Sequence, residues 1–396
     1  MVSFENTEIA FASKSNRDLK RAYRLFKLME FTGLVKMGSS VMNLAMKLNL
    51  PVKGIIKRTI FKQFCGGETI LECDKTIIEL NKFNVGTILD YSVEGKLDKE
   101  DFTDTVNELI STIIRANGEH AIPFAVFKIT GLANFNLLKR VNDESAEISE
   151  ADRKALDAVV ERVDTICAKA HEFKVPVFID AEESWIQDVI DRICAEMMRR
   201  YNKEQSIVFN TVQMYRHDRL QFLKDSIKEA KDNGYNYGVK LVRGAYMEKE
   251  RARAEERGYP SPIQVDKAAT DKDYNLALEH VVQHIDYCKL CAGTHNEASS
   301  EFLTTLLDKY DLDKRDRRVY FAQLLGMSDH ISYNMSFEGY NVAKYVPYGP
   351  VKEVIPYLLR RAEENSSVKG QTGRELSLIM KEKKRRKKSS KPVARR

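Results

Sequence analysis

Short apolar runs alternate with amphipathic stretches from residue 85 onward. Eight runs rich in β-branched and aromatic residues occur at 85–93, 124–132, 175–182, 207–215, 237–246, 287–296, 318–327 and 341–349. Helical apolar spacing fills the segments between them, at 100–116, 150–173, 185–202, 217–232, 264–286, 297–310 and 351–365. Parallel strands need such crossovers, and near-continuous apolar runs indicate strands that are buried on both faces. Eight strand–helix units predict a (β/α)8 barrel.

A doubly wound open sheet is the alternative fold. It normally has a glycine-rich phosphate turn after its first strand. Here the first run ends DYSVEG, which lacks that turn. The long segment 247–263 after the fifth run predicts a mobile lid.

The two ends of the chain differ from the barrel region. Residues 1–84 have helical spacing and many charges, which predicts an N-terminal helical arm before a barrel at 85–367. The last 16 residues hold ten Lys or Arg and one Glu, so the net charge of +6 falls to −3 over residues 1–380. We expect residues 368–396 to be a disordered basic tail. Attraction of this tail to anionic lipid or nucleic acid is the alternative, although it has no aromatic residue for base stacking.

Composition predicts a globular chain in a reducing cytoplasm. No stretch of about 18 apolar residues predicts a membrane span. The first 20 residues lack the apolar core of a signal peptide, and Glu5 and Glu8 argue against a transit peptide. Six cysteines do not make a disulfide scaffold in a chain this long. Cys288 and Cys291 form a lone CxxC within a predicted buried strand, where we expect a packing role.

Polar residues cluster at the carboxyl ends of the predicted strands, where barrel active sites lie. They are Asp90, Glu94, Lys128, Asp180, Gln213, Tyr215, Lys240, Arg243, Tyr246, Thr294, His295, Asn296, Gln323 and Tyr345. The set has no pair of histidines at metal spacing, and the chain has no GxSxG nucleophile motif. A Schiff-base role for Lys128 is an alternative. A site with many hydrogen-bond donors and no set of metal-ligating residues predicts that a bound cofactor carries out the chemistry.

The segment YLLRRAEEN at 357–365 adds an arginine pair on a predicted helix. Arg360 and Arg361 diverge by about 100° around the helix axis. Glu364 lies within pairing reach of both. The pattern fits either a surface ion-pair helix or an arginine clamp for a substrate carboxylate, and spacing does not separate the two.

The motifs LDYSVEG, KITGL, IDAEES, KLVRGAY, AGTHN, QLLGM and YVPYGP, followed by YLLRRAEEN, appear in this order. Over residues 85–367 the chain therefore resembles the proline dehydrogenase family, and it looks like the monofunctional members. The resemblance implies a distorted (β/α)8 barrel that binds FAD noncovalently. It implies oxidation of L-proline to Δ1-pyrroline-5-carboxylate, the first step of proline catabolism to glutamate, with electrons passed to a membrane quinone.

The resemblance also implies roles for residues at the matching motifs. Substrate-side positions are Arg360, Arg361, Lys128, Tyr345, Leu324, Tyr246, Glu364 and Glu94, with the arginines and Lys128 on the proline carboxylate and Glu94 as a gate. Cofactor-side positions are Asp180, Gln213, Lys240, Arg243, Thr294, His295 and Asn296, with Lys240 near the flavin N5. Some bacterial members have Trp where Met247 stands, and Arg and Lys where Lys240 and Arg243 stand.

The resulting hypothesis is hydride transfer from proline C5 to flavin N5, with no obvious catalytic base. A 4-hydroxyproline dehydrogenase is one rival, against which the bulky Tyr345 argues. The other is an inactive barrel that acts as a binding protein through its basic tail. The expected location is cytoplasmic, or peripheral on the inner membrane, with no nucleic-acid partner, and no feature of the sequence predicts an oligomeric state.

Overall fold

Eight parallel strands close into one barrel in chain order, with β8 paired to β1. The computed structural model describes residues 2–30, 53–92, 99–143, 145–367 and 371–389. The strands are β1 Val85–Tyr91, β2 Phe124–Lys128, β3 Val177–Asp180, β4 Val208–Gln213, β5 Tyr237–Val242, β6 Cys288–Gly293, β7 Val319–Leu324 and β8 Val342–Tyr348. Each lies within one of the eight predicted runs. The barrel prediction is therefore confirmed, and the open-sheet alternative is wrong.

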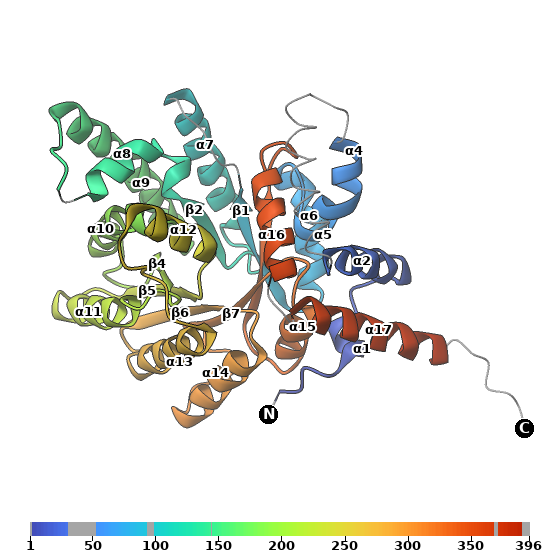
Figure 1. Cartoon of the computed structure of the whole chain (residues 1–396). Helices are drawn as coiled ribbons and strands as arrows, with labels where there is room; N and C mark the ends of the chain where they lie inside the picture. Colours follow the sequence, from blue (N-terminus) through green and yellow to red (C-terminus); the bar gives the residue numbers. More distant parts are fainter. Residues whose placement is uncertain (1, 31–52, 93–98, 144, 368–370, 390–396) are drawn as a thin grey trace, which may run out of the picture.

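Helices surround the barrel as an outer layer (Figure 1). They are α7 Lys99–Ala116, α8 Phe135–Asn142, α9 Glu150–Phe173, α10 Ser184–Tyr201, α11 Arg219–Asp232, α12 Met247–Arg257, α13 Lys267–Gln283, α14 Glu297–Lys309, α15 Asp329–Phe337 and α16 Ile355–Ser367. The sequence pattern did not predict α15, whose residues are nearly all buried and therefore lack an amphipathic period. The final predicted helix begins at Ile355 rather than at 351, because a turn follows Pro350.

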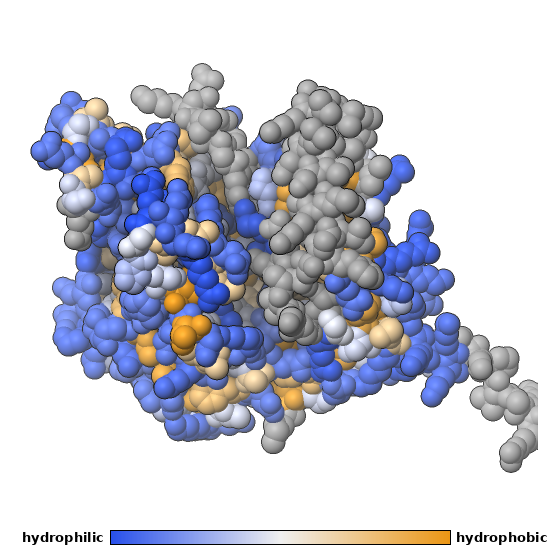
Figure 2. Space-filling model, viewed as in Figure 1, coloured by the Kyte–Doolittle hydropathy of each residue, from blue (hydrophilic) through white to orange (hydrophobic). Residues whose placement is uncertain are grey.

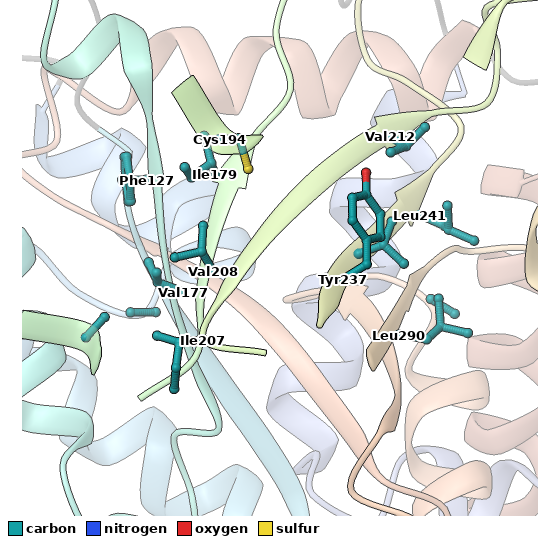
Figure 3. Packing of buried hydrophobic residues seen from close by; sticks show 14 of the residues in the cluster. Phe127, Val177, Ile179, Cys194, Ile207, Val208, Val212, Tyr237, Leu241 and Leu290 are labelled. Atoms are coloured by element: carbon teal, nitrogen blue, oxygen red, sulfur yellow. The ribbon is translucent and has the colours of Figure 1, made fainter. Parts of the chain in front are cut away.

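The barrel interior is filled by alternate residues of the strands. Phe124, Phe178 and Phe209 lie near the amino ends of their strands, and the Phe124 and Phe178 rings stack with centroids 4.5 Å apart. The intervening residues face the helices, as Val177 and Ile179 do in the cluster of Figure 3. This two-residue alternation places polar side chains above the aromatic plug, at the carboxyl ends of the strands.

The CxxC cysteines serve packing. Cys288 and Cys291 are free, buried residues of β6. Burial raises the pKa of each thiol to about 12, so neither is a ready thiolate.

The described residues of the N-terminal arm are largely helical and pack beside the barrel (Figure 1). Its elements are α1 Thr7–Ala10, α2 Asn16–Met29, α4 Lys53–Ile56, the π-helix η1 Lys57–Phe61, α5 Lys62–Phe64 and α6 Ile70–Asn81. Leu19 and Phe26 of α2 join a second apolar cluster that also holds Leu358 of α16. The arm therefore packs against α16, the helix that carries the arginine pair.

The expected disordered tail differs from the structure over residues 371–389. These residues form helix α17, Gln371–Ser389, which packs on α2 (Figure 1). Leu378 and Ile379 are each 1% exposed. Arg386 donates to the Phe11 carbonyl oxygen at 2.9 Å and to the buried Glu382. The high charge of this segment predicted a solvated chain, but the burial of these apolar residues against the arm stabilises a helix. Residues 368–370 and 390–396 lie outside the described part of the chain.

The coloured part of the surface in Figure 2 is largely hydrophilic, with smaller apolar patches. None of the described helices combines the length and apolar character that crossing a bilayer requires.

Candidate active site

Four side chains from four strands meet at the carboxyl end of the barrel. Asp180, the last residue of β3, forms an ion pair with Lys240 of β5. Tyr345 of β8 donates from its hydroxyl to Asp180 Oδ2 at 2.7 Å, and Lys128 Nζ lies 3.5 Å from the same oxygen. Lys240 Nζ also donates to the Tyr345 hydroxyl at 3.2 Å. The strand ends that the sequence singled out are therefore in direct contact.

One carboxylate and two ammonium groups of this cluster meet inside the barrel. Burial raises the pKa of Asp180, but the positive charges of Lys240 and Lys128 outweigh it and hold this pKa below its ordinary value. Burial raises the pKa of the neighbouring Asp90, which accepts a hydrogen bond from Ser92 at 2.5 Å. Asp180 is therefore the fixed anion of the site, with two ammonium groups beside it.

A second group lies between the ends of β5 and β6. The Arg243 guanidinium donates to Thr294 Oγ1 at 2.7 Å, to Ser299 Oγ at 2.9 Å and to Asp271 Oδ1 at 2.7 Å. Asn296 is the N-cap of α14, and its side chain accepts from the Ser299 backbone amide at 3.1 Å. An arginine and a helix N-terminus at one place favour a bound anion, because both present N–H donors in a positive field.

Gln213 is the last residue of β4, and His295 follows the end of β6. His295 Nδ1 is 2.9 Å from Ser328 Oγ. Burial and the nearby charges of Lys344 and Arg361 lower the pKa of His295 to about 3, so the ring is neutral at ordinary pH. Gln213 donates to the Glu182 carbonyl oxygen at 2.8 Å, while its own buried Oε1 has no hydrogen-bond partner among the described residues.

The predicted apolar wall lies on β7. Leu324 is the register partner of Tyr345 on β8, and both belong to the apolar packing inside the barrel. Tyr345 is therefore held at its hydroxyl by Asp180 and lies in the apolar cluster against which Leu324 packs.

The remaining residues predicted to lie on the substrate side belong to helices or to a helix cap. Tyr246 is the N-cap of α12, and its pKa is raised well above its ordinary value, by burial and then by the charge of Glu182. The charges of Lys128 and Arg360 act on the same hydroxyl, so Tyr246 and Arg360 face one region. Arg361 is 8% exposed, and its guanidinium lies 5.3 Å from the centroid of the Tyr357 ring. A partly buried arginine pair disfavours the surface ion-pair interpretation.

Two predicted residues cannot be placed in this site. Glu94 lies outside the described residues. Glu364 belongs to α16, but its side chain is not among those described.

The sequence analysis missed Glu182, two residues after Asp180. It is 4% exposed, and its carboxylate accepts from the Thr130 backbone amide at 3.0 Å and from the Thr130 hydroxyl at 2.5 Å. Burial raises its pKa to about 7. The IDAEES motif contained the signal, since three acids in five residues after a buried strand are unusual.

Comparison with known proteins identifies the family. The family model described as proline dehydrogenase matches residues 73–374. The chain belongs to the proline dehydrogenase family. It is 32% identical to proline dehydrogenase 1, mitochondrial, of Dictyostelium discoideum, over 96% of this chain and 74% of that protein. It is 40% identical to the human proline dehydrogenase 1, mitochondrial, over 59% of this chain and 40% of that protein. A hydroxyproline dehydrogenase of Xenopus laevis is 30% identical, over 95% of this chain and 85% of that protein.

Solved structures agree on the fold of this proline dehydrogenase family member. Proline utilization A of Bdellovibrio bacteriovorus, inactivated by N-propargylglycine, superposes with a TM-score of 0.71 at 21% identity. The match covers 91% of this chain and 38% of that one, so the chain spans about two fifths of the larger protein.

The strand ends of this family member present hydrogen-bonding groups that a bound ligand could use. No set of three or more histidine, cysteine or carboxylate side chains is arranged to hold a metal ion in the part of the chain that the structure describes. The unpartnered Gln213 Oε1 at a strand end instead offers an acceptor to a ligand N–H group. Arg243 and the start of α14 offer donors to phosphate oxygens.

Proposed function

We propose that the protein is an FAD-dependent proline dehydrogenase that oxidises L-proline to Δ1-pyrroline-5-carboxylate. Its place in the proline dehydrogenase family carries this proposal. The cluster of Asp180, Lys240, Lys128 and Tyr345 at the strand ends supports it, because this cluster supplies a charged, water-poor site of the kind that cofactor chemistry needs.

The cofactor side of the site would be formed by the strand ends of β3 to β6. Lys240, Asp180 and Gln213 would lie along the flavin ring system, and Arg243 with residues 294–296 would hold its phosphates. The flavin supplies a two-electron acceptor for the hydride that leaves proline C5.

The protein's own residues bind and orient the substrate. Arg360 and Arg361 on α16, with Lys128, supply positive charge for the carboxylate of proline. Leu324 and Tyr345 pack against the ring and exclude water, which favours the uncharged amine that can lose hydride. Fixing the carboxylate sets the position of C5, so orientation supplies much of the rate.

Proline is the proposed substrate rather than 4-hydroxyproline. The Tyr345 hydroxyl is held by Asp180 at 2.7 Å and by Lys240 at 3.2 Å, so its ring cannot turn away without breaking two buried hydrogen bonds. A substrate ring hydroxyl beside it would meet the phenol face and lose its own hydration.

The electron acceptor and location extend the same proposal. We infer a membrane quinone as acceptor and peripheral contact with a membrane. The basic residues of α17 that face away from the arm, such as Lys384 and Lys388, would favour an anionic surface. The test is cosedimentation of the protein with anionic vesicles. If replacing both lysines by glutamate does not change the fraction of protein that pellets, the membrane contact is contradicted.

An absorbance spectrum with anaerobic substrate tests the function. We expect a flavin spectrum that bleaches on addition of L-proline and changes little with 4-hydroxyproline. Arg361→Lys keeps the charge but loses the planar fork, so the KM for proline should rise about tenfold or more. If proline does not reduce the bound flavin, the substrate is a compound other than proline. A protein that binds no FAD would leave the binding-protein alternative.

A further inference from the structure

Helix α12 lies in the segment 247–263 that was predicted to be a lid, and a buried carboxylate links it to the start of α10 by hydrogen bonds. Glu250 is 0% exposed, and it accepts from the Ser184 backbone amide and from the Ser184 hydroxyl, each at 2.6 Å. Ser184 is the first residue of α10, and the N-cap residue Glu183 makes no side-chain cap of its own. Glu250 therefore supplies the missing cap from another helix, where the α10 dipole also favours its charge.

The contacts beside Glu250 strengthen this attachment. Lys249 forms an ion pair with Glu183. The Arg253 guanidinium lies 4.5 Å from the centroid of the Trp185 ring, and Lys249 Nζ lies 5.7 Å from it. Residues 249, 250 and 253 share one side of α12, so this side contacts three consecutive residues, 183–185.

The same helix carries a residue of the substrate pocket. Tyr246 is the N-cap of α12, one turn before Glu250, and its carbonyl oxygen accepts from the Glu250 amide at 2.9 Å. The Tyr246 hydroxyl lies in the field of Glu182, Lys128 and Arg360. A shift of α12 along α10 therefore moves Tyr246 relative to these groups.

Both ends of the segment 244–264 are attached to Tyr215. A Cβ at Gly244, where φ is +138°, would lie 2.5 Å from the Tyr215 ring, so only glycine allows this close approach. At the other end, the Gln264 amide donates to the Tyr215 carbonyl oxygen at 2.7 Å. With the ends fixed, the buried Glu250 accepts the hydrogen bonds that hold the middle of the segment against α10.

We propose that Glu250 is a positioning residue for substrate binding: by capping α10 it holds α12 down and keeps Tyr246 in place over the pocket. Glu250 itself does not touch the substrate. The inference rests on the proposed function only for its kinetic consequence. The attachment of α12 is a structural statement with its own readout.

Tryptophan fluorescence tests the attachment, because Trp185 is the only tryptophan in the chain and Arg253 lies over it. Acrylamide quenching would be measured on the FAD-loaded full-length protein at equal flavin content. We expect Glu250→Ala to raise the quenching constant about twofold or more, since α12 then no longer shields the ring. Glu255→Ala is the matched control, because Glu255 lies exposed on the same helix. Equal quenching in wild type and Glu250→Ala would overturn the inference.

Proline kinetics test the positioning. Glu250→Ala should raise the KM for proline about tenfold while kcat changes less than about threefold, because binding is lost before chemistry. Glu250→Gln retains an acceptor for the Ser184 amide and should recover most of the loss. A Glu250→Ala protein with exposed Trp185 but an unchanged KM would show that Glu250 only stabilises the fold, which overturns the proposal.

A milder variant covers the case in which Glu250→Ala does not fold. Ser184→Ala removes the hydroxyl donor but keeps the backbone donor, and it should change both readouts in the same direction by a smaller factor. Absence of any change in Ser184→Ala, together with an unfolded Glu250→Ala, would count against positioning. If the wild-type protein does not oxidise proline, the proposed function is wrong. The acrylamide quenching constants still show whether Glu250 holds α12 against α10.

Discussion

The buried carboxyl of Glu182 predicts an unusual dependence of stability on pH. Burial is the largest cause that raises its pKa from 4.5 to about 7, the charge of Glu183 adds to it, and the Thr130 bonds and the charge of Lys128 oppose it. Tyr246 faces the same carboxyl from α12. Between pH 4.5 and 7 the folded protein holds a proton that the unfolded chain has released. The free energy of unfolding therefore falls as pH rises through this window.

The size of the effect follows from the pKa difference. A shift from 4.5 to about 7 corresponds to about 3 kcal/mol of lost stability once the pH is well above 7. In Glu182→Gln the side chain carries no proton to lose, while its amide still accepts from the Thr130 backbone amide and donates to the Thr130 hydroxyl oxygen. The variant should match the wild type near pH 5 and exceed it at pH 8 by about 4 °C in Tm, because the unfolding entropy of a chain this long is about 0.8 kcal/mol/K.

Melting curves of both proteins from pH 5 to pH 8 would test this reasoning, with loss of circular dichroism as the signal. Glu255→Gln removes the same charge from an exposed position of α12 and should run parallel to the wild type. Parallel curves for wild type and Glu182→Gln would refute the assigned titration of Glu182.

Three further outcomes are expected. Tyr345→Ser removes the phenol that Asp180 holds, so the ratio of kcat/KM for hydroxyproline over proline should rise about tenfold, and an unchanged ratio would remove Tyr345 from substrate selection. Arg374→Ala breaks half-exposed ion pairs to Glu5 and Glu297. The free energy of unfolding should fall by about 1 kcal/mol, and by less in 1 M NaCl, because salt screens these pairs. A loss of stability that does not depend on salt would indicate lost packing instead. Removing FAD should lower Tm by about 5 °C, with recovery on adding FAD back, and a Tm that ignores FAD would contradict cofactor binding.

The barrel was predictable because local patterns and the global fold agree. Runs such as 175–182 are short, apolar and separated by helical spacing, so each strand could be located before any pairing was known. The order of the barrel then follows from parallel pairing of neighbours. The strand-end positions of Lys128 and Asp180 followed from the same pattern.

The C-terminal helix shows where local patterns fail. Residues 381–388 contain seven cations and one acid, which by charge alone predicts a solvated chain. In the structure, Leu378 and Ile379 pack into the arm, and Glu382 is 0% exposed between Arg385 and Arg386. The hydrogen bond from Arg386 to the Phe11 carbonyl oxygen joins residues 375 positions apart, and no short window of the sequence contains both of them.

The site divides in the same way. The sequence by itself determined which polar side chains lie at the strand ends, because strand period and barrel topology fix that edge. Only the tertiary structure decided that Asp180 joins Lys240 and Tyr345, that burial raises the pKa of Glu182, and that Glu250 caps a helix 66 residues away. Desolvation and cross-element hydrogen bonds depend on which atoms exclude water from a group, and this is set by the folded packing rather than by the neighbours in the chain.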